Sequence, residues 1–188
     1  MNKRTSIQLK PDLNKIQEAI LYLMSLADGL TQYDIVKTLF LADRAHLNKH
    51  GRPVTFDNYV AMEHGPVPSL AYDSLKPEWD YGKRFGSERP WLSAPDAFNA
   101  KTNHYTRRRE PDLDYLSSTD LDELRSALGT VRSLTFPQLR RLTHGDPAYK
   151  EAWESRGSKY SEPMLLPLLI EEGGEELAAN LAYISAHS

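Results

Sequence analysis

The segment from residue 37 to residue 72 constrains the fold most, because it begins with a helix that carries a carboxylate on its apolar face. The side chains of this face fall at positions i, i+3, i+4, i+7 and i+11, and they are Val36, Leu39, Phe40, Asp43 and Leu47. This spacing predicts an amphipathic helix whose stripe faces the core. Asp43 lies within the stripe, so we expect it to be buried and to need hydrogen-bonding or charged partners.

Cationic side chains that could pair with Asp43 lie close to it in the sequence. We expect arginine or histidine groups from the GRP (51–53) to GPVP (65–68) segment to hold its carboxylate. Such a polar cluster either locks two elements together or forms a site. Its predicted members are Asp43, Arg44, His46 and His144.

The composition is that of a soluble globular protein with one domain. The chain has 188 residues, a mean hydropathy of −0.57 and a net charge of −3. It contains no cysteine, which excludes disulfides and thiolate metal sites. The longest apolar run, from Met164 to Ile170, is interrupted by Pro167 and is too short to span a bilayer. No apolar region follows the basic N-terminus, so we expect no signal peptide, no membrane partner and a cytoplasmic location.

The chain divides into three parts by pattern. Residues 1–11 form an N-terminal tail, and residues 12–170 form the domain. Residues 171–188 form an acidic C-terminal helix packed on the domain or appended to it, with four glutamates and neither lysine nor arginine. We expect Leu177, Leu181 and Ile184 to face inward from this helix.

Local capping signals mark most of the expected helices. Thr31 with Asp34, and Ser117 with Asp120, have the spacing of N-terminal caps. Gly51 is expected to end a helix in the left-handed conformation. The patterns predict helices over 12–27, 31–50, 66–75, 117–131, 135–142 and 175–186, and another that begins at residue 147.

Strand signals are fewer and shorter. Residues 54–62 read as one or two short strands, and residues 98–108 as a strand or hairpin within a loop-rich region. We therefore expect a mainly α fold of the α+β class. It would be a compact helical domain with a small antiparallel sheet or hairpin.

The EHGPVP segment allows two interpretations. It could be a rigid, exposed loop suited to recognition, which would lose little entropy on binding. It could instead be a tight turn from strand to helix, with Gly65 at positive φ and Pro66 fixing the start of the helix.

Signals for catalysis and metal binding are weak. Asp43, His46 and His50 could share one helix face and bind a divalent ion, with Glu63 as a general base. The same spacing arises in ordinary amphipathic helices, and no motif for nucleotide binding or hydrolysis is present. We expect no enzymatic activity, no metal and no cofactor.

A DNA-binding regulator that represses its own promoter is the alternative function. Helices over 12–27 and 31–49, followed by a basic hairpin near Arg107, loosely resemble a winged helix. Three consecutive arginines at 107–109 could follow phosphates, although such a run is more often a solvated face. The second helix offers few cations for base contacts.

Three stretches of the chain together resemble a known family. They are FLADRAHLNKHGRPVTFDNYVAMEHGPVPSLAYDSLK, YLSSTDLDELRSALGT and LRRLTHGDPAYKEAW, and they cover roughly residues 12–156 in order. The series is similar to the Panacea domain, the SocA-like antitoxin domain of bacteria and their phages. Many relatives carry tryptophan where this chain has Tyr149.

The resemblance implies a mainly helical α+β fold and an antitoxin that neutralises a protein toxin by direct contact. It also leaves open a role as adaptor to a ClpXP-type protease, as known for SocA itself. Promoter DNA stays a further candidate partner. The residues that we expect at the partner-binding surface are Arg52, Pro53, Glu63, His64, Gly65, Pro66, Val67, Pro68 and Ser69.

Overall fold

The computed structural model describes residues 7–96 and 102–187. The α-helices are α1 (Leu13–Leu26), α2 (Gln32–His50), α3 (Ser69–Leu75), α4 (Tyr81–Phe85), α5 (Ser118–Ser133), α6 (Phe136–His144), α7 (Pro147–Ser155), α8 (Leu166–Leu169) and α9 (Gly174–His187). A short 3-10 helix covers Leu113–Tyr115. The strands are β1 (Leu30–Thr31), β2 (Tyr59–Met62), β3 (Gly65–Pro68), β4 (Trp91–Pro95), β5 (Asn103–Arg107) and β6 (Glu162–Pro163).

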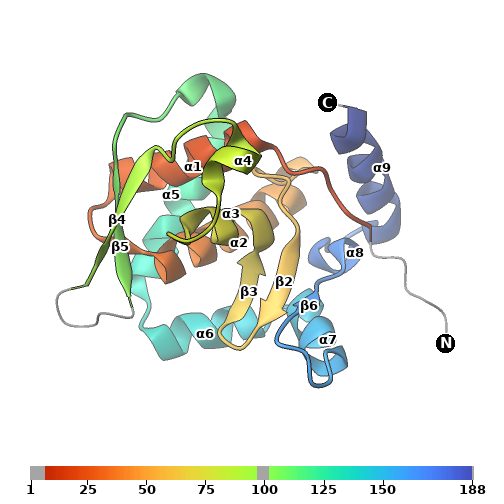
Figure 1. Cartoon of the computed structure of the whole chain (residues 1–188). Helices are drawn as coiled ribbons and strands as arrows, with labels where there is room; N and C mark the ends of the chain where they lie inside the picture. Colours follow the sequence, from red (N-terminus) through yellow and green to blue (C-terminus); the bar gives the residue numbers. More distant parts are fainter. Residues whose placement is uncertain (1–6, 97–101, 188) are drawn as a thin grey trace.

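The expected fold class is confirmed, because helices dominate and the strands form two small antiparallel sheets. One sheet has the order β1–β5–β4 and the other β3–β2–β6. The first sheet lies beside α1, and the β2–β3 hairpin extends below α2 and α3 (Figure 1). No helix in the described part of the chain is both long and apolar enough to cross a membrane.

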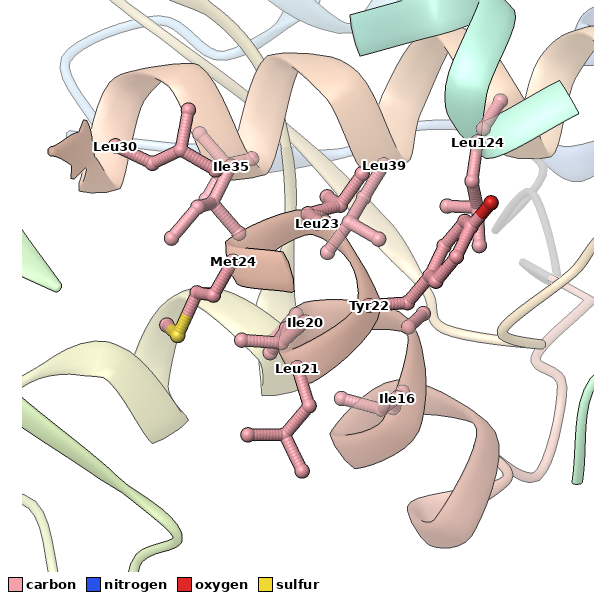
Figure 2. Close-up of a cluster of buried hydrophobic side chains, with 14 of the residues drawn as sticks. Ile16, Ile20, Leu21, Tyr22, Leu23, Met24, Leu30, Ile35, Leu39 and Leu124 are labelled. Atoms are coloured by element: carbon pink, nitrogen blue, oxygen red, sulfur yellow. The ribbon is translucent and has the colours of Figure 1, made fainter. Parts of the chain in front are cut away.

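Helix α2 is the centre of the molecule. Its Ile35 and Leu39 belong to a core cluster shared with α1, α3 and α5, and its Phe40 and Leu47 belong to a second cluster shared with α7, α8 and α9. In the first cluster, Ile35 and Leu39 extend from α2 toward α1, whereas Leu21 points to the far side of α1 (Figure 2). Helix α2 is therefore covered on two sides, and its polar residues Lys37, Thr38, Asp43 and His46 are buried.

Local caps set the helix boundaries as expected. Thr31 and Asp34 form a capping box before α2, and Ser117 and Asp120 form another before α5. Gly51 ends α2 at φ +74°. Asp146 accepts hydrogen bonds from the backbone amides of residues 148 and 149 at the start of α7.

Several element predictions need correction. Pro66 and Pro68 do not lie in the first turn of a helix, since residues 65–68 form β3 and α3 begins at Ser69. A proline cannot donate a hydrogen bond to a sheet, but this strand pairs on one side only, with β2. Strand β4 and helix α4 were not expected, and part of the expected 98–108 segment lies outside the described residues.

Both ends of the described part of the chain pack on the rest of the structure. Leu9 is buried in the second core cluster, and its backbone exchanges two hydrogen bonds with the Asn58 side chain. Helix α9 buries Leu181 as expected, and Leu177 packs partly against the same cluster. The inward direction expected for Ile184 is wrong, because that residue is 55% exposed and Ser185 is buried instead.

Candidate functional site

The candidate site is built around Lys37, a lysine of α2 that is only 1% exposed. Its ammonium donates a hydrogen bond to the Pro66 carbonyl at 2.7 Å, and it lies 5.3 Å from the ring centre of Tyr33 one turn earlier. Burial lowers the pKa of Lys37 to about 7. A buried amine with so low a pKa is a common mark of a functional site.

The β2–β3 hairpin brings a glycine directly against this amine. Gly65 has φ +103°, a conformation that few residues other than glycine adopt. A Cβ at this position would lie 2.9 Å from Lys37 Nζ and 2.9 Å from the Thr143 hydroxyl. Only a residue without a side chain lets the hairpin approach α2 and α6 so closely.

Helix α6 closes the other side with Thr143 and His144. The His144 ring lies 3.3 Å from the position of that absent Cβ. Burial, together with the positive charges of Arg140, Lys37 and His64, lowers the pKa of His144 to about 4. We call Lys37, His64, Arg140 and His144 the basic cluster.

Aromatic side chains cover the same region. The Tyr33 and Phe136 rings lie 5.0 Å apart between centroids, and Phe136 meets the His64 ring edge-on at 5.7 Å. Burial is also the main reason that the pKa of Tyr33 is raised to about 12.

A cleft of about 300 Å³ opens beside these rings, between the start of α2, the hairpin and β5. We call it the hairpin cleft. Its lining residues include Tyr33, Lys37, Glu63, His64, Tyr72, Asn103 and the exposed Tyr160.

The hairpin is held from behind by α7. Tyr149 is buried, and its hydroxyl donates a hydrogen bond to the Met62 carbonyl at 2.9 Å. Its ring stacks on Trp153, with ring planes 12° apart. The aromatic ring at position 149 thus fixes the hairpin tip relative to α7.

Comparison with known families fits this arrangement. The family model of the SocA-like antitoxin Panacea domain matches residues 35–153, which is more than half of the chain. The chain belongs to this family. The match includes the hairpin, α6, most of α7 and Lys37. Neither the curated proteins nor the solved structures contained a match to the chain.

Within this Panacea domain, Asp43 is buried as expected but its partners are different. The carboxylate accepts hydrogen bonds from the amides of Val54 and Thr55 at 2.9 and 3.0 Å, and from the Thr55 and Tyr59 hydroxyls. The prediction that arginine or histidine groups hold it is wrong. Burial outweighs these hydrogen bonds and raises the pKa of Asp43 to about 6.

The other predicted members of the polar cluster lie in separate networks. Arg44 pairs with Asp146 at 2.6 Å and with Glu171 at 3.2 Å. His46 contacts Asp120 at 3.1 Å, and His144 belongs to the basic cluster. Adjacent residues on a helix point in different directions, which separates Arg44 from Asp43. His46 lies one turn after Asp43, but its ring bonds to the Arg52 carbonyl and the Thr119 hydroxyl instead.

The expected partner-binding residues divide into three groups. Glu63 and His64 are exposed at the hairpin tip, and His64 joins the site. Gly65, Pro66, Val67 and Pro68 are buried, so the exposed-loop interpretation is wrong, and Ser69 is partly buried. Gly65 has the positive φ of the other interpretation. Arg52 lies elsewhere, since it pairs with Asp120 at 2.9 Å, and Pro53 is buried.

The arrangement does not support the residues considered for DNA or metal binding. Arg107 donates to the Met24 carbonyl, and Arg109 pairs with Glu18, so two of the three arginines serve the fold. Helix α2, which would be the recognition helix, is buried on both sides. Among the described residues, no group of three or more acidic, histidine or cysteine side chains is placed to hold a metal ion.

Sequence reasoning missed Lys37 and the part played by α6. Lys37 follows Val36 in the stripe, so it reads as a solvent-facing lysine on an amphipathic helix. The only sequence signal for this contact is Gly65, which is followed by Pro66 and Pro68. A glycine in a strand indicates that another group comes close to the backbone, but it does not show which side chain does so.

Proposed function

We propose that this chain is an antitoxin that neutralises a protein toxin by direct binding, through the surface around the hairpin cleft. The membership of the SocA-like antitoxin family is the observation that carries this proposal. The proposal includes no enzymatic activity and no cofactor, and it places the complex in the cytoplasm.

The composition of the surface supports the choice of this face. Exposed Tyr160, Phe136 and His64 lie around the cleft, with Arg140 on the adjacent helix face. Aromatic and arginine side chains supply most of the binding energy at protein interfaces. The hairpin and α6 are also fixed by buried contacts, so little order has to be gained on binding.

The test is expression of the neighbouring open reading frame with and without this protein. We expect the neighbour to stop growth alone and to be harmless when the two proteins are co-expressed. A neighbour that is harmless alone, or that stays lethal beside a folded copy of this chain, contradicts the antitoxin proposal.

A pair of variants on α6 tests the surface. Phe136 and Leu142 are 49% and 48% exposed on the same helix, but only Phe136 contacts Tyr33 and His64. We expect Phe136→Ala to weaken toxin binding by about tenfold or more, as at an interface hot spot. Leu142→Ala is the control and should bind normally. Equal binding by both variants would place the toxin elsewhere.

Toxin abundance separates two modes of neutralisation. Simple occlusion leaves toxin levels unchanged in cells that express both proteins. Delivery to a ClpXP-type protease lowers toxin levels, and deletion of the protease restores them. The first outcome is the one we expect, because the hairpin cleft offers a direct contact surface without a further partner.

A further inference from the structure

Lys37 has fewer partners than a buried ammonium requires. An ammonium has three N–H donors. Here it makes one hydrogen bond, to the Pro66 carbonyl, and one contact with the face of the Tyr33 ring. No carboxylate pairs with it among the described residues, although a buried lysine is normally paired.

The side chains gathered around Lys37 are mainly basic. The other groups of the basic cluster, His64 and Arg140 with Lys37 itself, all disfavour a positive charge on His144. These groups come from three elements, namely α2, the hairpin and α6. Because basic groups converge here and no carboxylate pairs with Lys37 among the described residues, the arrangement fits a negative group supplied from outside.

Two hydrogen-bonding groups at the same place also lack partners. The Tyr33 hydroxyl and the His144 Nε2 atom are shielded from solvent, and neither makes a hydrogen bond within the described part of the chain. Leaving such groups unpaired costs free energy. Tyr33 lines the hairpin cleft together with Lys37.

We propose that the hairpin cleft receives a carboxylate of the toxin, an aspartate or glutamate side chain, which pairs with the Lys37 ammonium and accepts a hydrogen bond from the Tyr33 hydroxyl. This inference rests on the proposed function and names the chemistry of its contact. Glu63 lines the same cleft and Asp34 lies near Tyr33. These two negative charges favour a singly charged carboxylate over a doubly charged phosphate.

When the toxin carboxylate pairs with Lys37, the complex should take up a proton, because a carboxylate favours the charged form of the amine. The titratable and charged groups around Lys37 come from three elements. They are Tyr33 and Asp34 on α2, Glu63 and His64 on the hairpin, and Arg140 and His144 on α6. Proton uptake is therefore assigned to Lys37 only by comparison with a variant that lacks its amine.

The experiment uses the full chain and the purified toxin in isothermal titration calorimetry at pH 8, in two buffers with different ionisation enthalpies. The variant is Lys37→Met, which keeps the length of the side chain and removes the amine. The control is Lys83→Met, because Lys83 is exposed on α4 away from the cleft. Circular dichroism melting confirms that each variant is folded.

We expect Lys37→Met to bind the toxin about 30-fold more weakly or worse, the size of effect seen when one partner of a buried ion pair is removed. The wild type and Lys83→Met should take up close to one proton, and Lys37→Met none. Alanine scanning of the toxin's acidic residues should find one whose loss costs little in the Lys37→Met background, because the partner is already gone.

Normal affinity of Lys37→Met for the toxin, or unchanged proton uptake, would overturn the carboxylate proposal and leave the antitoxin proposal standing. Displacement of the toxin by inorganic phosphate at a few millimolar, with Lys37→Met resistant to it, would also overturn it in favour of a small-anion site. If the wild-type chain does not bind the toxin, the proposed function is wrong, and this inference fails with it.

Discussion

The Lys37 ammonium donates its hydrogen bond to the Pro66 carbonyl across 29 residues of sequence, at a distance of 2.7 Å. This contact joins the central helix to β3, the hairpin strand that packs against α2.

Gly65→Ala should destabilise the protein by about 3 kcal/mol. The left-handed backbone costs an alanine about 1 kcal/mol, and the added methyl group collides with Lys37 and Thr143. Gly86→Ala is the control, because Gly86 has φ +72° but no atom lies within 4 Å of its Cβ position. Urea unfolding of both variants separates backbone strain from collision. Equal losses would mean that the hairpin can move away from α2.

Lys37→Met should stabilise the protein at pH 7, by on the order of 2 kcal/mol, because it removes a buried amine at the expense of one hydrogen bond. The lowered pKa of Lys37 determines whether the stability of the wild type rises or falls with pH. The unfolded chain holds its proton up to about pH 10.5, whereas the folded protein releases it near 7. Wild-type stability therefore rises relative to the variant between pH 7 and pH 10. Chemical unfolding across this range measures the difference, and a constant difference would contradict burial of the amine.

Asp43→Ala should cost about 3 kcal/mol, because it leaves two backbone amides and two hydroxyls of the 54–59 segment without their acceptor. Asp73→Ala serves as the comparison, since Asp73 makes only a partly exposed ion pair with Lys76. Thermal melting at pH 7 is sufficient. If the two variants melted alike, the carboxylate of Asp43 would not be holding this segment.

Asp120→Asn should lower stability by about 2 kcal/mol at pH 7. Burial alone would raise the pKa of Asp120, but hydrogen bonds from Arg52 and Lys15 outweigh it and lower the pKa to about 2. The stabilisation is therefore complete above pH 4 and is lost as the pH falls through 2. Acid unfolding should begin at a higher pH in the variant than in the wild type. Asp122→Asn, at an exposed position on the same helix, should unfold like the wild type.

Features written into neighbouring residues were predictable from the sequence. Thr31 with Asp34, Ser117 with Asp120, and Asp146 before Pro147 each cap a helix by bonds to residues at most three positions away. No knowledge of the tertiary structure is needed to recognise such signals. The burial of Asp43 was also predictable from the sequence, because Asp43 lies within the apolar stripe of its helix.

Features decided by distant parts of the chain were not predictable. Lys37 is buried because β3 and α6 fold over it, and its partner Pro66 is remote in sequence. Residues 65–68 were expected to enter a helix because prolines suit a first turn, but pairing with β2 decides in favour of a strand. The candidate site depends on both of these long-range contacts. Of the residues expected from the sequence, Glu63, His64, Gly65, Pro66, Val67 and His144 lie in or beside this site, whereas Lys37 and Tyr33 were missed.

The burial pattern of the hairpin also limits how such a protein can change its partner. Only Glu63 and His64 are exposed at the tip, and the four residues that follow are enclosed. In the proposed complex, we expect substitutions that redirect specificity at these two positions, at the exposed Tyr160 and on the outer face of α6. Gly65 and Lys37 lie beneath them and have to stay unchanged, because the two residues fit against each other. We expect one scaffold to accept different toxins by exchanging a handful of surface side chains, at almost no risk to folding.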